Sequence, residues 1–150
     1  MVTDVGELRA FKIFEELNDR ELETVAKIAK TETLGVGARL TEFGTPASRL
    51  YLVREGSVTV MMPAGPAGKE IPVDEIGPGD VIGWSAITGP FLYTASTECS
   101  QASTLIVLNS NRLRELFETN NHIGYRVLKG IGNVISRRMA ALEKRCGSLV

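Results

Sequence analysis

Between residues 31 and 109 the chain breaks into short apolar runs separated by glycine and proline, and this pattern limits the fold more than any other feature. The runs Arg49–Val53 and Ser57–Met61 flank Gly56, and Ser103–Leu108 is the last clear run of this kind. Short runs of this composition, bounded by turn residues, are typical of β-strands. Because several follow one another at nearly regular spacing, the middle of the chain is predicted to form a β-sandwich or barrel.

Helical segments are predicted on both sides of these strands. Residues 5–30 have a helical pattern, in which Asn18 followed by Glu21 predicts a capping box. Ser110 is predicted to cap a helix, and a longer helix is expected from about Asn121 to Arg145. The expected class is mainly β with flanking helices. The chain is expected to be one domain over residues 1–150, divided into N-terminal helices (1–30), a β-roll (31–109) and C-terminal helices (110–146).

The long C-terminal helix carries an apolar stripe close to a coiled-coil seam. Leu128, Ile131, Ile135 and Leu142 repeat in steps of three, four and seven residues. This spacing predicts a homodimer contact made by these four residues, and packing against the β-roll is the alternative. Glycine lowers helix stability by about 1 kcal/mol relative to alanine, but it allows another backbone to approach closely. The helix holds three such residues, Gly124, Gly130 and Gly132.

Charge and composition argue against several classes of function. The formal net charge is −1, whereas nucleic-acid-binding domains usually carry a basic excess, so no nucleic-acid partner is expected. No apolar run approaches the roughly 18 residues of a membrane helix, and the start of the chain lacks a signal-peptide core, so a cytoplasmic protein is expected. Cys99, Cys146 and His122 form no cluster along the sequence, so neither a metal site nor an enzyme of the Ser/His/Asp kind is predicted.

Basic residues gather toward the end of the chain. Their position near a helix C-terminus predicts a solvated face that interacts favourably with the helix dipole. These residues are Arg137, Arg138, Lys144 and Arg145.

Three segments, taken in order, carry a resemblance to a known family. They are Leu8–Leu22, Leu50–Val60 and Ile76–Gly83. They resemble the opening helices, the signature hairpin and the start of the phosphate-binding cassette of the cyclic nucleotide-binding domain family, as found in the sensor domain of bacterial catabolite-activator-like regulators. The resemblance implies an eight-stranded jelly-roll (a double-stranded β-helix) with the ligand pocket inside and the last helix as lid and dimer contact. Transcription factors of this family add a helix-turn-helix, which is not expected in a chain that stops at Val150.

The cassette departs from the family pattern at the charged positions. The resemblance implies a Glu after the cassette glycine, which holds the ribose, and an Arg near the cassette end, which pairs with the cyclic phosphate. Here Trp84 follows Gly83, and Tyr93 and Thr94 stand near the Arg position. Losing a charge-assisted bond to a buried anion costs about 2–5 kcal/mol, which is about 30-fold to several thousandfold in affinity. Weak or no binding of cyclic AMP or cyclic GMP is therefore expected.

Two functions remain open from the sequence, and neither requires a cofactor. In the first, the chain is a stand-alone sensor: a cyclic nucleotide or another small ligand enters the roll, and a partner protein reads the repacked last helix. In the second, Trp84 plugs the pocket, and the chain is a ligand-free scaffold that dimerises or binds another subunit. The candidate ligand-binding residues are Gly83, Trp84, Ser85, Ala86, Tyr93, Thr94 and Ala95.

Overall fold

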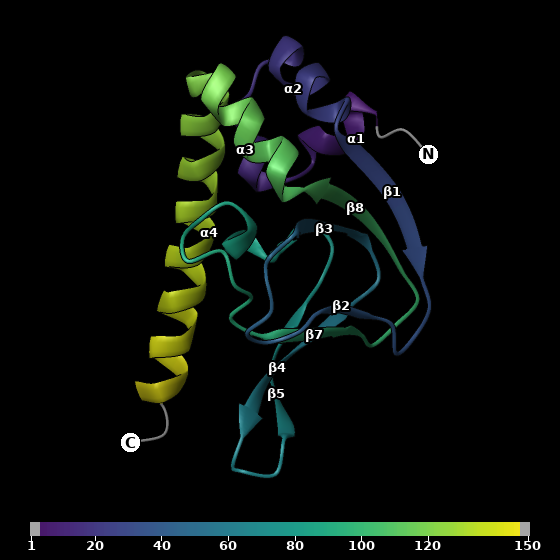
Figure 1. Ribbon diagram of the computed structural model, residues 1–150, viewed down its shortest axis with the longest axis vertical. Helices are drawn as coiled ribbons and strands as arrows, with labels where there is room; N and C mark the ends of the chain where they lie inside the picture. Colours follow the sequence, from purple (N-terminus) through teal and green to yellow (C-terminus); the bar gives the residue numbers. More distant parts are fainter. Residues whose placement is uncertain (1–3, 148–150) are drawn as a thin grey trace.

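Eight antiparallel strands form two four-stranded sheets in the computed structural model, which describes residues 4–147 (Figure 1). The first sheet has the strand order β1-β8-β3-β6 and the second has the order β2-β7-β4-β5. This arrangement confirms the predicted jelly-roll with flanking helices. The strands are β1 (Ala29–Leu34), β2 (Arg39–Thr41), β3 (Arg49–Glu55), β4 (Val58–Ala64), β5 (Lys69–Ile76), β6 (Val81–Ile82), β7 (Ser96–Cys99) and β8 (Ser103–Asn109).

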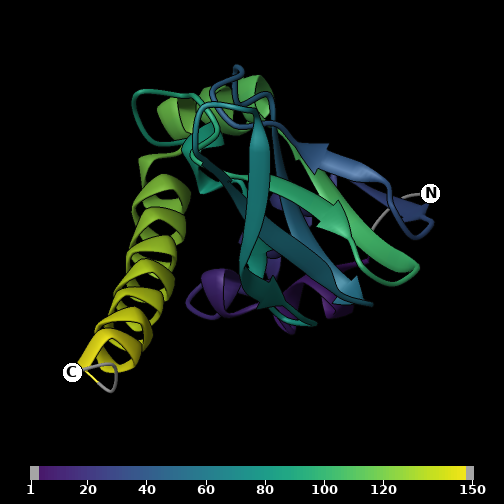
Figure 2. The ribbon, with the colours of Figure 1, turned by 90° about the horizontal axis from the view of Figure 1, so that it is seen from below.

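The helices lie at one end of the roll and along one side of it (Figures 1 and 2). The helical pattern over residues 5–30 resolves into three short helices, and the first strand already begins at Ala29. The capping box of Asn18 and Glu21 is present. Asn109, and not Ser110, caps the next helix, because its side chain accepts from the amide of Arg112. The helices are α1 (Val5–Arg9), η1 (Lys12–Phe14), α2 (Asp19–Ala26), η2 (Trp84–Ala86), α3 (Ser110–Thr119) and α4 (Asn121–Gly147).

The core has two parts that share the strands β3 and β8. Leu50 and Leu52 belong to the part under the helices, while Tyr51 and Val53 belong to the part inside the roll. Because alternate residues of a strand point to opposite faces, both faces of β3 are buried. This explains why the run Leu50–Val53 is continuously apolar, as expected for a strand covered on both sides.

The fully buried side chains of the long helix α4 lie in its first half. Ile123, Val127, Ile131 and Val134 are buried there. Gly130 allows the close approach, since a Cβ atom at this position would lie 2.6 Å from the carbonyl oxygen of Ile13 in η1. Beyond Val134 most side chains of the helix are exposed, apart from the partly buried Ile135 and Arg138, and the helix continues alongside the roll (Figure 1).

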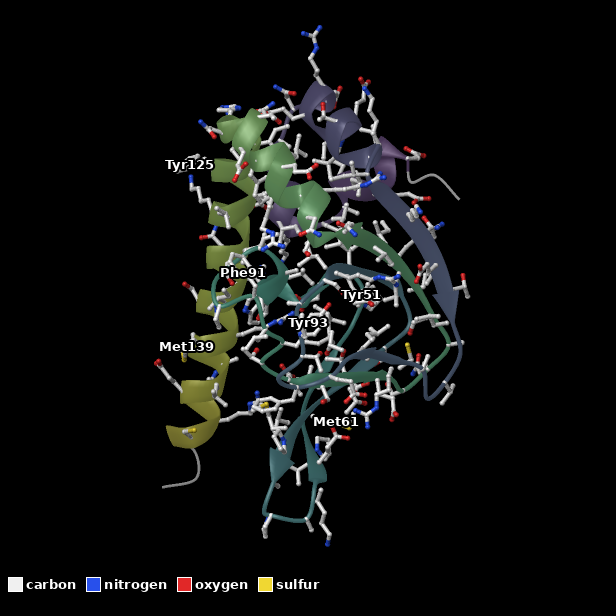
Figure 3. The ribbon with its side chains drawn as sticks, viewed as in Figure 1. Tyr51, Met61, Phe91, Tyr93, Tyr125 and Met139 are labelled. Atoms are coloured by element: carbon white, nitrogen blue, oxygen red, sulfur yellow. The ribbon has the colours of Figure 1, made fainter. Side chains whose placement is uncertain are left out.

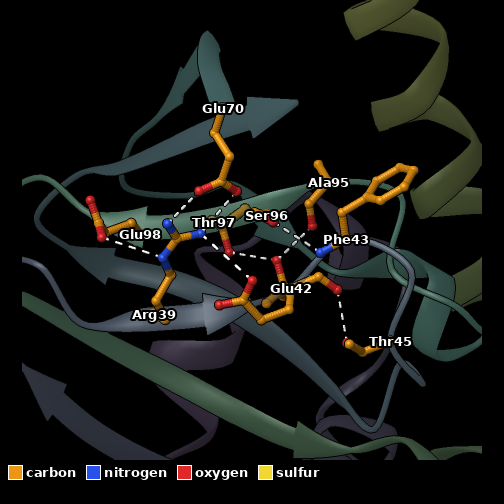
Figure 4. A network of polar contacts seen from close by, with 10 residues as sticks. Arg39, Glu42, Phe43, Thr45, Glu70, Ala95, Ser96, Thr97 and Glu98 are labelled. Carbon is orange, nitrogen blue, oxygen red and sulfur yellow. Dashed lines mark hydrogen bonds and ion pairs between the residues drawn. The ribbon is translucent and has the colours of Figure 1, made fainter. Parts of the chain in front are cut away.

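Figure 4 shows the polar network that ties β2 to β5 and β7. The Arg39 guanidinium donates to both oxygens of Glu70, at 2.5 and 3.1 Å, and its Nε lies 3.4 Å from Glu98. The hydrogen bond from Arg39 lowers the pKa of the Glu70 carboxyl. Nearby, the hydroxyl of Thr41 lies 2.8 Å from that of Thr97, and these two residues lead from the network into the interior of the roll.

Candidate functional site: the cassette pocket

The loop after β6 begins with Gly83, which is in the left-handed region with φ 81°. A side chain there would meet the carbonyl oxygen of Arg49 at 3.0 Å and the ring of Tyr93 at 3.1 Å. Only glycine combines this backbone conformation with so little room. Gly83 precedes η2, a short helix at the wall of the pocket.

Trp84, the first residue of η2, is held from the outside by an arginine of α4. The guanidinium of Arg138 lies 4.7 Å from the centre of the indole ring, a cation–π contact. The same guanidinium donates to Oδ1 of Asp80 at 2.6 Å and to the carbonyl oxygen of Val81 at 2.7 Å. The expectation that Arg138 belongs to a solvated face is therefore wrong. Instead, Arg138 attaches α4 to the cassette.

Two hydroxyl groups at the pocket, those of Tyr93 and Ser96, are already engaged by the backbone. The Tyr93 hydroxyl donates to the carbonyl oxygen of Arg49 at 2.7 Å and accepts from its amide at 3.0 Å. Burial raises the pKa of Tyr93, so the phenol stays protonated, and Figure 3 shows it in the middle of the molecule. Ser96 Oγ accepts from the amide of Phe43 at 2.9 Å. Little of this hydrogen-bonding capacity is left for a ligand.

The space that remains inside the roll is small. The inner cavity has a volume of about 60 Å³, whereas pockets that hold small molecules usually measure about 300–1,000 Å³. Trp84 and Arg138 contribute to its wall. The lining residues are Thr41, Val60, Ile76, Ile82, Gly83, Trp84, Ser85, Tyr93, Thr94, Ala95, Thr97 and Arg138.

Outside the cavity, a larger groove runs between the roll and the second half of α4. It has a volume of about 420 Å³, and Trp84, Thr94, Ala95 and Arg138, together with Val60 and Ile76, border both spaces. Its other walls are mostly apolar. They are formed by Met62, Val73 and Asp74 on the roll and by Ile135, Met139, Leu142 and Arg145 on α4.

Most of the predicted ligand-binding residues gather at this cavity. Six of the seven line it, and the seventh, Ala86, is buried in the core beside it. Sequence reasoning missed Thr41, Thr97 and Arg138. A signal for Arg138 was available, since it lies four residues after Val134 and seven after Ile131, on the helix face that is buried.

The predicted dimer residues lie on one side of α4 but differ in their exposure. Leu128 and Leu142 are exposed, at 42% and 50%, and Ile135 is half-buried, but Ile131 is only 1% exposed and lies in the core. The prediction that Ile131 contacts a second molecule is therefore wrong, because its side chain lies in the core. The exposed stripe has steps of three and four and consists of Tyr125, Leu128, Gly132, Ile135, Met139 and Leu142.

The part of the chain that the structure describes holds neither a membrane-spanning helix nor a cluster of metal ligands. No helix within residues 4–147 has the length and hydropathy to span a membrane. Within the same residues, no three His, Cys, Asp or Glu side chains gather as a set of metal ligands.

In a comparison with known protein families, residues 31–120 match the family model of the cyclic nucleotide-binding domain. A cyclic nucleotide-gated potassium channel of Mesorhizobium japonicum is 27% identical over 114 residues. The match covers 76% of this chain, which spans only about 30% of the channel's length.

Solved structures share the fold over nearly the whole chain. A protein of Geobacter metallireducens GS-15, assigned as cyclic nucleotide-binding, is 24% identical with a TM-score of 0.82, and the match covers 91% of this chain and 98% of that one. The regulatory subunit of a cAMP-independent protein kinase A from Trypanosoma brucei is 21% identical with a TM-score of 0.70, covering 89% of this chain and 45% of that one.

Proposed function

We propose that this chain, which belongs to the cyclic nucleotide-binding domain family, is a non-enzymatic regulatory module whose pocket is closed to cyclic AMP and cyclic GMP in the state described above. One observation carries the proposal: Trp84 stands where the family has its ribose-binding Glu, and Arg138 of α4 stacks on it at 4.7 Å. A ligand of nucleotide size does not fit a cavity of about 60 Å³. Entry of any ligand would have to move Trp84, and Arg138 would transmit that movement to α4.

The chemistry of the pocket supports this interpretation. Within the described residues, none of the side chains that line the inner cavity is a carboxylate, and the one arginine is already bonded to Asp80. A cyclic phosphate buried there would lack the charge-assisted partner that usually stabilises it. A ligand that opens this pocket would be largely apolar, since the outer groove is lined mainly by aliphatic side chains and Trp84. The regulatory subunit from Trypanosoma brucei, described as part of a cAMP-independent kinase, offers a parallel within the same fold.

Restoring the two family charges tests the proposal. Trp84→Glu together with Thr94→Arg should allow cyclic AMP to bind at least about tenfold more tightly than it binds the wild-type protein, because an Arg–phosphate pair contributes about 2–5 kcal/mol. The measurement is calorimetric titration, with each single variant as a control. If the double variant gains nothing at millimolar ligand, the loop does not have the geometry of a working cassette.

A second candidate function, a ligand-free dimer scaffold, is favoured by the exposed stripe on α4. Tyr125, Leu128, Met139 and Leu142 are 42–65% exposed although they are large and apolar, and Figure 3 locates Tyr125 and Met139 along the helix. The steps of three and four between these positions are those of a two-stranded coiled coil. Gly132 lies on the same stripe with open space around it, which leaves room for a second helix. In this alternative the pocket stays closed and the chain acts through its dimer contact alone.

A further inference from the structure

A second cavity lies outside the roll, between α4 and the loop that leads into the cassette. Its volume is about 420 Å³, which is within the usual range for small-molecule sites. We call it the basic cleft. It is lined by Ala10 and Lys12 near the N-terminus, by Pro78, Gly79 and Asp80 before β6, and by Val134, Arg137, Arg138 and Ala141 on α4.

The charges in the basic cleft do not balance. Lys12, Arg137 and Arg138 are positive and Asp80 is the one carboxylate, so the walls carry two more positive charges than negative ones. Asp80 is already bonded to Arg138. Among residues 4–147 neither Lys12 nor Arg137 has a carboxylate within ion-pair distance, and Arg137 contacts only the carbonyl oxygen of Asn133 in its own helix. The whole chain has a net charge of −1, so this positive charge is local.

The two sides of the basic cleft are held in place by close packing. Lys12 begins η1, and the next residue, Ile13, touches α4 at Gly130. Val134, Arg137, Arg138 and Ala141 follow on the same face of α4, where residues three and four apart are neighbours. At these four residues η1 no longer covers α4, so this face of α4 is open to solvent. A cleft with fixed walls requires little ordering when a ligand binds.

Arg138 belongs to both the basic cleft and the inner cavity. It connects Asp80, on the cleft side, with Trp84, on the pocket side. Its Nε atom is buried and has no hydrogen-bond partner, one of two such side-chain atoms in the described part of the chain. An anion in the cleft would compete with Asp80 for this guanidinium and would therefore act on its contact with Trp84.

We propose that the basic cleft binds a small multivalent anion of the phosphate type, and that Arg138 couples its occupation to Trp84 and the cassette pocket. Arginine is suited to phosphate oxygens because its planar guanidinium can donate two hydrogen bonds at once, and lysine adds a point charge. The site lies outside the roll and exists whether or not the roll accepts a ligand, although occupation of one would influence the other through Arg138.

Inorganic pyrophosphate is the probe for the test. Trp84 is the only tryptophan of the chain, so its fluorescence reports on its contact with Arg138 while calorimetry reports on binding. We expect saturable binding that weakens with salt, because exposed charges are screened, together with a change in Trp84 fluorescence. The double variant Lys12→Gln and Arg137→Gln should bind about tenfold more weakly or worse. The control is Arg20→Gln with Lys27→Gln, which removes two exposed positive charges at α2, away from the cleft.

Three results would overturn the inference. Absence of saturable binding at millimolar pyrophosphate means that the basic cleft is not a site. Equal weakening in both double variants means that the anion binds by overall charge and not in the cleft. Binding without any change in Trp84 fluorescence contradicts the coupling through Arg138. None of these results bears on cyclic nucleotide binding in the roll, which is measured separately.

Discussion

At the scale of single residues, Trp84 and Arg138 decide what the pocket can do. They are 54 positions apart in the sequence, and the fold brings the guanidinium to 4.7 Å from the indole. The sequence alone predicted that Trp84 replaces a charged residue, because the cassette glycine fixes its position. It did not predict the partner of Trp84, because a helix face has no fixed orientation toward a loop until the tertiary structure is known. The helical spacing from Val134 to Arg138 was the one available signal.

Glu21 is a buried carboxylate that joins α2 to α4. Its Oε2 lies 2.6 Å from Nδ1 of His122, and its Oε1 accepts from the amide of Asn18 at 3.0 Å. Burial raises the pKa of Glu21, but the hydrogen bonds from Asn18 and His122 and the charges of His122 and Arg126 together outweigh it, so that the pKa lies below its ordinary value of 4.5. A carboxylate whose pKa is lowered on folding stabilises the fold above its unfolded pKa and loses that contribution as the pH falls.

We therefore expect Glu21→Gln to lower the free energy of unfolding by about 1–2 kcal/mol at neutral pH. The difference from the wild-type protein should be present at neutral pH and shrink as the pH falls below 4.5. Urea denaturation over a pH series measures it. Glu23→Gln, at an exposed position of the same helix, is the matched control. A loss that does not change with pH would mean that the charge of Glu21 is not what stabilises the contact.

At the scale of elements, the sequence predicted some strands and not others. Short apolar runs bounded by turn residues indicated β3, β4 and β8, and β8 extends the predicted run Ser103–Leu108 by one residue, whereas β1, β2, β6 and β7 are short or carry no such run. The N-terminal helical pattern was less informative, because its breaks at residues 10 and 15–18 depend on packing against α4. The sequence analysis placed Ile131 in the dimer stripe of α4, but the stripe passes through Gly132 instead. Ile131 lies three residues after Leu128 and Gly132 lies four after it, so helical spacing alone fits both. Only the packing of Ile131 in the core decides between them.

The glycines of α4 give a matched pair of variants. Gly130→Ala should destabilise the protein by about 1–3 kcal/mol, because its Cβ would lie 2.6 Å from the Ile13 carbonyl oxygen and overpacking has this cost. Gly132→Ala, with nothing within 4 Å, should stabilise the monomer by about 0.5–1 kcal/mol through higher helix propensity. Denaturation at low protein concentration measures both. Equal stabilisation by the two changes would contradict the contact between α4 and η1.

At the scale of the whole molecule, the fold follows from the sequence but its assembly does not. The order of helices and strands predicted a β-sandwich or barrel with flanking helices, and the resemblance to the family implied the jelly-roll. The sign of dimerisation is an exposed apolar stripe on α4. Such a stripe indicates an interaction surface but does not identify the partner.

The dimer contact can be tested by substituting residues inside and outside the exposed stripe of α4. Leu128→Glu with Leu142→Glu should convert a dimer into a folded monomer, because each change would bury a charge in the contact. Light scattering measures the mass and circular dichroism the fold. The control is Asn133→Glu with Ala140→Glu, two exposed positions of α4 outside the stripe, which should leave the mass unchanged. Ile131→Glu should instead disrupt the fold, because Ile131 is in the core. A wild-type protein that is monomeric at high concentration would refute the dimer.

The central claim is that Trp84 and Arg138 close the roll to the ligands typical of its family. Calorimetric titration of cyclic AMP and cyclic GMP into the wild-type protein tests it most directly. We expect no saturable heat below millimolar ligand, since the inner cavity of about 60 Å³ is too small and the hydroxyl groups of Tyr93, Thr41 and Thr97 are engaged. Binding at micromolar concentration would contradict it, because Trp84 would then have to leave the pocket at little cost in free energy.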